Sequence, residues 1–283
     1  MTLNAHVEVS SSNSPLKPNF ADTARKIERA NHHLFEFERA AKAFFDKHPW
    51  STGMMPEQRG MRFVIPVGER RPFPDRAFSL IIGDIVHNLK TSLDYILAAC
   101  AIAHGNAIDQ TEFPVGLRRS DILPRMKRRV RPAGGVAEAL VLAARPYRRG
   151  NELLWAMAEL DRQDKHRLVV PTACLTKVAI TAGGWNGLPP RTVFGRFRDG
   201  EGLLVEPAIG YEKALMMEAS YNPEIVFAHR SPLRGRPCIE SLWAMSEATA
   251  TVLQSFENAF GTIRFSRKLL EVSAQRLSGA REQ

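Results

Sequence analysis

The chain has few cysteines, with only three among its 283 residues. Cys100, Cys174 and Cys238 lie far apart and form no CxxC pair or Cys/His cluster. An odd, scattered set of this kind argues against a disulfide framework and against a structural zinc site. We therefore expect reduced thiols in a cytoplasmic protein.

Long apolar runs are also missing. No segment approaches the roughly 20 consecutive apolar residues that a membrane-spanning helix needs. Residues 1–20 lack the basic and apolar regions of a secretory signal, and they are rich in Ser, Asn and Pro. We expect a flexible N-terminus over these residues and no membrane partner.

The common catalytic and nucleotide-binding motifs are absent. The sequence contains no G-x-G-x-x-G, P-loop, HExxH or G-x-S-x-G pattern. The absence of these motifs argues against the enzymes that bind nucleotide cofactors or hydrolyse substrates through them. The sequence identifies no cofactor. Whether the protein catalyses any reaction stays open at this point.

Apolar residues recur at helical spacing through the first part of the chain. This periodicity predicts long helices over 21–48, 75–104 and 151–165. Shorter helices are predicted over 119–130 and 136–145, where Pro and Gly interrupt the pattern.

The pattern changes after residue 167. Short β-rich segments separated by Gly and Pro turns follow, and a long helix starts near Pro237. Because that helix needs the earlier ones to bury its apolar face, we expect a mainly helical α+β protein. It would be a helical bundle with a β-rich insertion before the last long helix. The predicted organisation is a single domain over 21–270, with helices over 21–167, the insertion over 168–230, the closing helix over 237–266, and a C-terminal tail over 271–283.

Positive charge is concentrated in one segment. The whole chain carries +9, and the segment from Arg118 to Arg149 holds ten basic and two acidic residues, a net charge of +8. A basic concentration of this size is typical of proteins that bind a phosphate-bearing partner. A solvated, Arg-rich surface helix would give the same pattern. The residues that we expect to contact RNA or DNA are Arg118, Arg119, Arg125, Lys127, Arg128, Arg129 and Arg131.

The helix predicted over 75–104 carries an unusual polar face. Compact hydrogen-bonding side chains share an arc of roughly 120° in place of the usual Lys and Glu. They are Asp84, His87, Asn88, Thr91, Asp94 and Tyr95. Asp84 and His87 are one turn apart, so the pair can orient and charge an imidazole or share a metal. The alternative is a structural polar seam between helices.

A second concentration of charge lies at the junction between the helix over 151–165 and the β-rich segment. It contains Asp161, Asp164, Lys165, His166 and Arg167. Cations that complement a helix C-terminus explain the basic residues but not the two aspartates. We expect the polar face to lie against this junction. The candidate catalytic residues are Asp84, His87, Asn88, Asp164 and His166. A divalent metal held by the Asp and His residues of this set stays open.

Three stretches resemble a family of uncharacterised bacterial proteins: LIIGDIVHNLKTSLDYILAA, LLWAMAELDRQDKHRLVV and FAHRSPLRGRPCIESL. The family signatures are G-D-x-x-H-N-L-R-S-x-L-D-H and D-K-H-R, and the resemblance spans about residues 21 to 265. The matching residues are Gly83, Asp84, His87, Asn88, Leu93, Asp94, Asp164, Lys165, His166 and Arg167. The resemblance implies no particular activity.

The chain is similar, more loosely, to HEPN-type helical domains, whose metal-independent ribonucleases use R-x4–6-H on a helix. In the family signature above, the Arg and the last His make such a motif, and here those positions are Lys90 and Tyr95. Lys lacks the bidentate geometry of Arg, and Tyr is a poor base near neutrality. This resemblance implies a ribonuclease relative whose motif is degenerate.

Three hypotheses about function remain. The first is a basic helical protein associated with nucleic acid, related to HEPN-type ribonucleases. The second is an enzyme, or a protein that binds a small ligand or metal, using the Asp/His cluster. The third is a non-enzymatic structural or interaction protein. Self-association is open under all three.

Overall fold

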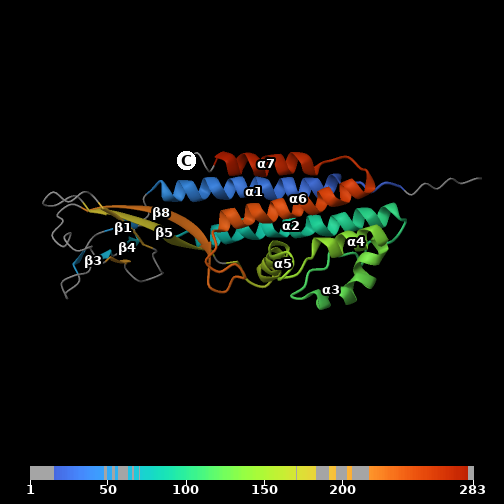
Figure 1. Cartoon of the computed structure of the whole chain (residues 1–283), viewed down its shortest axis with the longest axis horizontal. Coiled ribbons are helices and arrows are strands. Elements are labelled where there is room, and N and C mark those ends of the chain that lie inside the picture. Colours follow the sequence, from blue (N-terminus) through green and yellow to red (C-terminus); the bar gives the residue numbers. More distant parts are fainter. Residues whose placement is uncertain are drawn as a thin grey trace, which may run out of the picture. The chain divides into compact units, whose positions relative to one another are not determined.

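The computed structural model describes residues 16–47, 50–52, 55–56, 63–65, 67–69, 71–169, 171–182, 191–195, 203–205 and 217–279. Within these residues the protein is mainly helical, which confirms that part of the prediction (Figure 1). The described α-helices are α1 (Ala21–Phe45), α2 (Asp75–Ala103), α3 (Arg119–Arg125), α4 (Gly135–Ala144), α5 (Glu152–Asp164), α6 (Cys238–Phe260) and α7 (Ser266–Gly279). None of them is long and apolar enough to cross a membrane.

A π-helical turn and a 3-10 turn separate α3 from α4. The π-helical turn, η1, covers Met126–Val130, and the 3-10 turn, η2, covers Arg131–Ala133. Pro124 lies inside α3 and has no backbone N–H to donate, so α3 is short and the chain changes its helical geometry directly after it. The predicted helix over 119–130 is therefore two elements.

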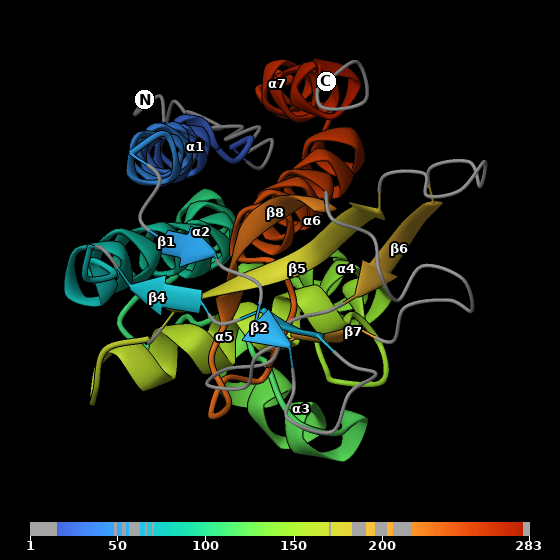
Figure 2. The same cartoon turned by 90° about the vertical axis from the view of Figure 1, so that its left-hand side faces the viewer.

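The described strands lie in two parts of the chain. Before α2 they are β1 (Trp50–Thr52), β2 (Met55–Pro56), β3 (Phe63–Ile65) and β4 (Val67–Glu69), and between α5 and α6 they are β5 (Pro171–Ala182), β6 (Arg191–Gly195), β7 (Leu203–Val205) and β8 (Met217–Phe227). All their pairings are antiparallel. β5 lies between β6 and β8 (Figure 2). Its register with β8 runs from Pro171 opposite Phe227 to Ala182 opposite Met217.

The chain forms two compact units, each built from segments that are distant in sequence. Unit 1 comprises Met1–Glu28, Leu89–Trp155 and Glu247–Gln283, and unit 2 comprises Arg29–Asn88 and Ala156–Ser246. The helices α1, α2, α5 and α6 contribute residues to both units. Hydrophobic periodicity reports helices and not which segments share a core, so the sequence does not reveal this division.

The apolar face of α2 is buried along its length. Its members are fully inaccessible to solvent: Ile82, Ile85, Val86, Leu89, Leu93, Ile96, Leu97 and Cys100. Burial of an Ile or Leu side chain contributes about 1.5 to 3 kcal/mol. The burial of this face therefore fixes the rotation of α2 about its axis. The polar residues lie on the remaining part of the helix surface, as the sequence predicts.

The C-terminal part of the chain differs from the prediction of one helix over 237–266 and a tail over 271–283. Instead, α6 ends at Phe260, Gly261 adopts a positive φ of 58°, and α7 begins at Ser266. The buried Glu257 carboxylate accepts the backbone N–H of Phe265 (2.8 Å) and bonds both the N–H and the hydroxyl of Ser266. Because these donors have no partner within α7, Glu257 stabilises the start of that helix.

We expect Glu257→Ala to lower the free energy of unfolding by about 2 to 4 kcal/mol, because it leaves buried donors without an acceptor. Urea denaturation at neutral pH measures the change. The control is Glu271→Ala, which removes an exposed partner of Arg267 and should cost less than about 0.5 kcal/mol. Equal, small effects of the two variants would contradict this account of α7.

Candidate functional site

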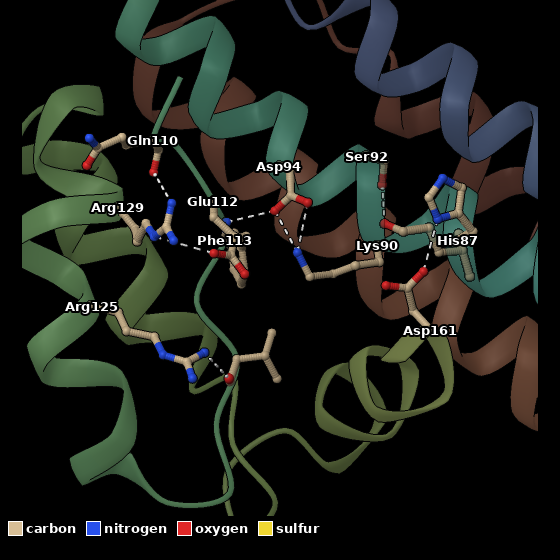
Figure 3. A network of polar contacts seen from close by, with 12 residues as sticks. His87, Lys90, Ser92, Asp94, Gln110, Glu112, Phe113, Arg125, Arg129 and Asp161 are labelled. Carbon is tan, nitrogen blue, oxygen red and sulfur yellow. Dashed lines mark hydrogen bonds and ion pairs between the residues drawn. The ribbon is translucent and has the colours of Figure 1, made fainter. Parts of the chain in front are cut away.

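α2 and α5 bring an imidazole to a buried carboxylate in unit 2 (Figure 3). The Nδ1–H of His87 donates to Oδ1 of Asp161 at 3.0 Å. Lys165 Nζ, one turn further along the chain, donates to Asp161 Oδ2 at 2.7 Å. The Asp161 side chain is 6% exposed and that of His87 is 52% exposed. Both oxygens of a nearly buried carboxylate are thus bound by groups that carry, or can carry, positive charge.

This contact fixes the chemistry of the His87 ring. When Nδ1 carries the proton that is donated to Asp161, the lone pair of the neutral imidazole lies on Nε2. An imidazole in this tautomer acts as a general base, and the carboxylate stabilises the imidazolium that forms. Since about half of the His87 side chain is exposed, the pair can act on a bound substrate or on water.

Asp164 lies directly against the backbone of α2 at Gly83. A Cβ atom at Gly83 would lie only 2.6 Å from both Asp164 carboxylate oxygens, so this approach requires glycine. Burial raises the pKa of the Asp164 carboxyl, and the charges of Asp161 and Asp84 raise it further, while His87 lowers it to a smaller extent. Within the described residues, the surroundings of Asp164 therefore disfavour the negative charge of its carboxylate.

Two further predicted residues do not join this pair. The Asn88 side chain donates to the backbone carbonyl of Asp84 at 2.8 Å, on its own helix. His166 is exposed in the turn that follows α5, and within the described residues its side chain forms no hydrogen bond or ion pair with the other candidates. Across the described ranges, no three His, Cys, Asp or Glu side chains are arranged to hold a metal ion. The geometry therefore does not favour a metal shared by Asp84, His87, Asp164 and His166.

In unit 1, the polar face of α2 continues as a structural contact. Lys90 Nζ donates to the two Asp94 oxygens at 2.6 and 2.8 Å, and Asp94 also accepts the backbone N–H of Phe113 at 2.8 Å (Figure 3). Burial raises the pKa of Asp94, although Lys90 lowers it. The Lys90 side chain is only 12% exposed. These contacts secure the chain after α2.

The basic segment supplies two arginines that hold neighbouring loops together in unit 1. The Arg125 guanidinium donates to the carbonyl of Val115 at 3.2 Å, and the Arg129 guanidinium donates to the carbonyl of Gln110 at 3.2 Å (Figure 3). Arg129 also forms an ion pair of 3.5 Å with Glu112. The two side chains are therefore engaged in the fold.

The other five predicted nucleic-acid-binding residues are exposed: Arg118, Arg119, Lys127, Arg128 and Arg131. Their side chains have no acidic partner in the part of the chain that the structure describes. Asp121, an acidic residue of the same segment, accepts the backbone N–H of Arg118 at 2.8 Å. The positive charge of this surface is thus largely uncompensated.

Two aromatic residues hold further arginines of the segment. The Arg145 guanidinium donates to the Tyr147 hydroxyl at 3.2 Å and lies 5.9 Å from the centre of its ring. The Arg148 guanidinium lies 5.1 Å from the ring centre of Trp155. The sequence does not indicate the contact with Trp155, because this residue lies outside the basic segment, on α5. Interactions of this kind orient the planar guanidinium.

No protein-family model, curated protein or solved structure matches the chain.

We expect Asp164→Asn to stabilise the protein at pH 7. A raised pKa means that the folded state binds the proton of Asp164 more tightly than the unfolded state, so the ionised carboxylate lowers stability. The gain should shrink as the pH falls towards 3.8, the ordinary pKa of the group. Urea denaturation at a series of pH values between 7 and 4 measures it.

Asp46→Asn is the control for that experiment, because the Asp46 carboxylate forms an exposed ion pair of 2.8 Å with Lys42. Removal of the Asp46 charge takes away a weak attraction, so the variant should not be more stable than the wild type at pH 7. A wild-type protein that is more stable than Asp164→Asn at pH 7 would show that the charge on Asp164 is balanced after all.

Proposed function

We propose that the protein binds RNA or DNA through the basic surface of unit 1, which consists of Arg118, Arg119, Lys127, Arg128 and Arg131. The observation that carries this proposal is that all five side chains are exposed and lack an acidic partner within the described residues. Cations of this kind displace the counterions condensed on a polyphosphate backbone, and the released ions drive association.

The surroundings of these five residues support the proposal. Arg145 and Arg148 lie on aromatic rings in the same unit, and a pre-oriented guanidinium suits contacts with phosphates and bases. The π-helical turn η1 carries Lys127 and Arg128, and such turns occur frequently at functional sites. Arg125 and Arg129 brace the loops around this turn.

The proposal includes a relationship to HEPN-type domains in which binding is retained and the R-x4-H motif is lost. Lys90 occupies the Arg position and is bound to Asp94. Tyr95 occupies the His position, where it is 40% exposed. Neither residue supplies the base that such a motif requires.

We expect Arg118→Glu/Arg119→Glu to weaken binding of a labelled single-stranded RNA at least about tenfold, and to reduce the slope of log K against log salt by about 2. Fluorescence anisotropy over a salt series measures both quantities. The fold should survive, because carboxylates are favourable at the N-terminus of α3.

Arg25→Glu/Lys42→Glu is the charge-matched control, because it makes the same change in net charge at two exposed residues of α1. Its affinity should stay within about threefold of the wild type at moderate salt, since charges outside the binding surface are screened. Equal losses from the two double variants would mean that net charge, and not this surface, determines binding.

The contact between His87 and Asp161 favours a second candidate function, general-base catalysis. In this reading His87 Nε2 removes a proton from a hydroxyl group or from water, and Asp161 stabilises the charge that the ring acquires. Lys165 keeps Asp161 in place through the other carboxylate oxygen. A ribonucleotide 2′-hydroxyl is the first substrate to test, because the protein carries a basic surface for phosphates.

For this second function, we expect His87→Gln to slow RNA cleavage in the presence of EDTA by at least about 100-fold. Its urea midpoint should change little, because the His87 side chain is half exposed and Gln keeps an N–H donor for Asp161. A large loss of stability without any cleavage by the wild type would make the pair a structural contact. Asp161→Asn, which keeps the volume of the side chain, separates loss of charge from loss of packing.

A further inference from the structure

Unit 1 contains a pocket of about 550 Å³ that is lined in part by residues of the basic surface. One wall comes from the loop that follows α2 and provides Asn106, Asp109 and Gln110. The other wall comes from η1 and η2 and provides Lys127, Arg128 and Arg131. The volume lies within the range of about 300 to 1,000 Å³ that is usual for small-ligand sites.

The two walls of this pocket are tied to each other. The Asn106 side-chain amide donates to the carbonyl of Pro132 at 2.8 Å. On the other side, Arg129 donates to the carbonyl of Gln110 at 3.2 Å, as Figure 3 shows, and its own carbonyl accepts the N–H of Glu112 at 3.4 Å. The pocket is therefore held by bonds at both ends of the loop and is formed before any ligand arrives.

The charges in the pocket favour a dianion. Lys127, Arg128 and Arg131 bring three positive charges and Asp109 brings one negative charge. No ion pair joins Asp109 to the three cations in the described part of the chain, so a net charge of +2 faces the ligand. A phosphate monoester carries about −1.5 to −2 at pH 7, whereas each phosphodiester of a nucleic acid backbone carries only −1.

We propose that this pocket binds a phosphate monoester, either at the end of a nucleic acid strand or on a free nucleotide. The three cations contact the phosphate. Asp109 and the amide oxygens of Asn106 and Gln110 accept hydrogen bonds from the sugar hydroxyls or from amino groups of the base. The strand-end form rests on the proposed function, because the basic surface of unit 1 would hold the rest of the strand.

The experiment compares one short single-stranded RNA in three forms, with a 5′-phosphate, with a 3′-phosphate, or with hydroxyls at both ends. One of the phosphorylated forms should bind about tenfold more tightly than the hydroxyl form, the gain expected of charge-assisted hydrogen bonds to a dianion. AMP should compete for the pocket at concentrations at which adenosine does not.

Two double variants test whether the preference for a phosphorylated RNA end arises in the pocket. Lys127→Ala/Arg131→Ala should bind all three RNA forms with the same affinity to within about twofold, because the dianion loses two of its three partners while Arg118 and Arg119 still hold the strand. Arg118→Ala/Arg119→Ala should weaken the three forms in parallel and keep the tenfold ratio. Urea denaturation confirms that both proteins are folded.

The outcomes separate this inference from the proposed function. If all three RNAs bind equally, with a steep salt dependence, and AMP does not compete, the pocket proposal is wrong and the basic surface remains. If AMP binds and no RNA does, the pocket takes free nucleotides and the nucleic-acid function is wrong. Binding of neither AMP nor any RNA form overturns both.

Discussion

The complete burial of one face of α2 is the constraint on which the candidate catalytic pair and the loop after the helix depend. Eight Ile, Leu, Val and Cys side chains on that face have no exposed surface, and turning the helix would expose several of them at about 1.5 to 3 kcal/mol each. The opposite face is therefore fixed. It presents His87 to α5 and Asp94 to the backbone of Phe113.

The buried carboxylate of Asp161 is the second constraint, because a buried charge is costly unless it is paired. His87 and Lys165 each bind one of its oxygens. Asp164 lies one helical turn away, against Gly83, and among the described residues it has no comparable cation. The two aspartates thus differ in kind: Asp161 orients an imidazole, while Asp164 keeps an excess of negative charge beside it.

The helices could be predicted from the sequence because periodicity reports which side of a helix is buried. α1, α2 and α5 begin and end within a few residues of their predicted bounds. The first part of the polar face of α2 could also be placed, because His87 meets Asp161 of α5, whereas Asp94 binds the backbone of Phe113 instead. The sequence could not show which carboxylate binds His87, because the choice between Asp161 and Asp164 depends on the rotation of α5. His166 lies beyond the end of that helix, where no periodicity applies.

Other features depend on contacts between segments that are distant in sequence. The pocket residues Asn106, Asp109 and Gln110 lie in a loop, and only the folded structure brings them to Lys127 and Arg131. The start of α7 depends on Glu257, which sits nine residues before Ser266. Gly261 and Ser266 were the local signals for a break between two helices, since a glycine with positive φ and a serine at a helix start are common there.

Hydrogen–deuterium exchange with and without saturating single-stranded RNA tests the central claim, that the basic surface of unit 1 binds nucleic acid, most directly. The account predicts slower exchange of backbone amides in peptides covering 104–112 and 118–131, at low salt, with the effect lost at high salt. Unchanged exchange in those peptides under conditions where RNA is bound, or protection confined to peptides covering 84–88 and 161–167, would contradict it.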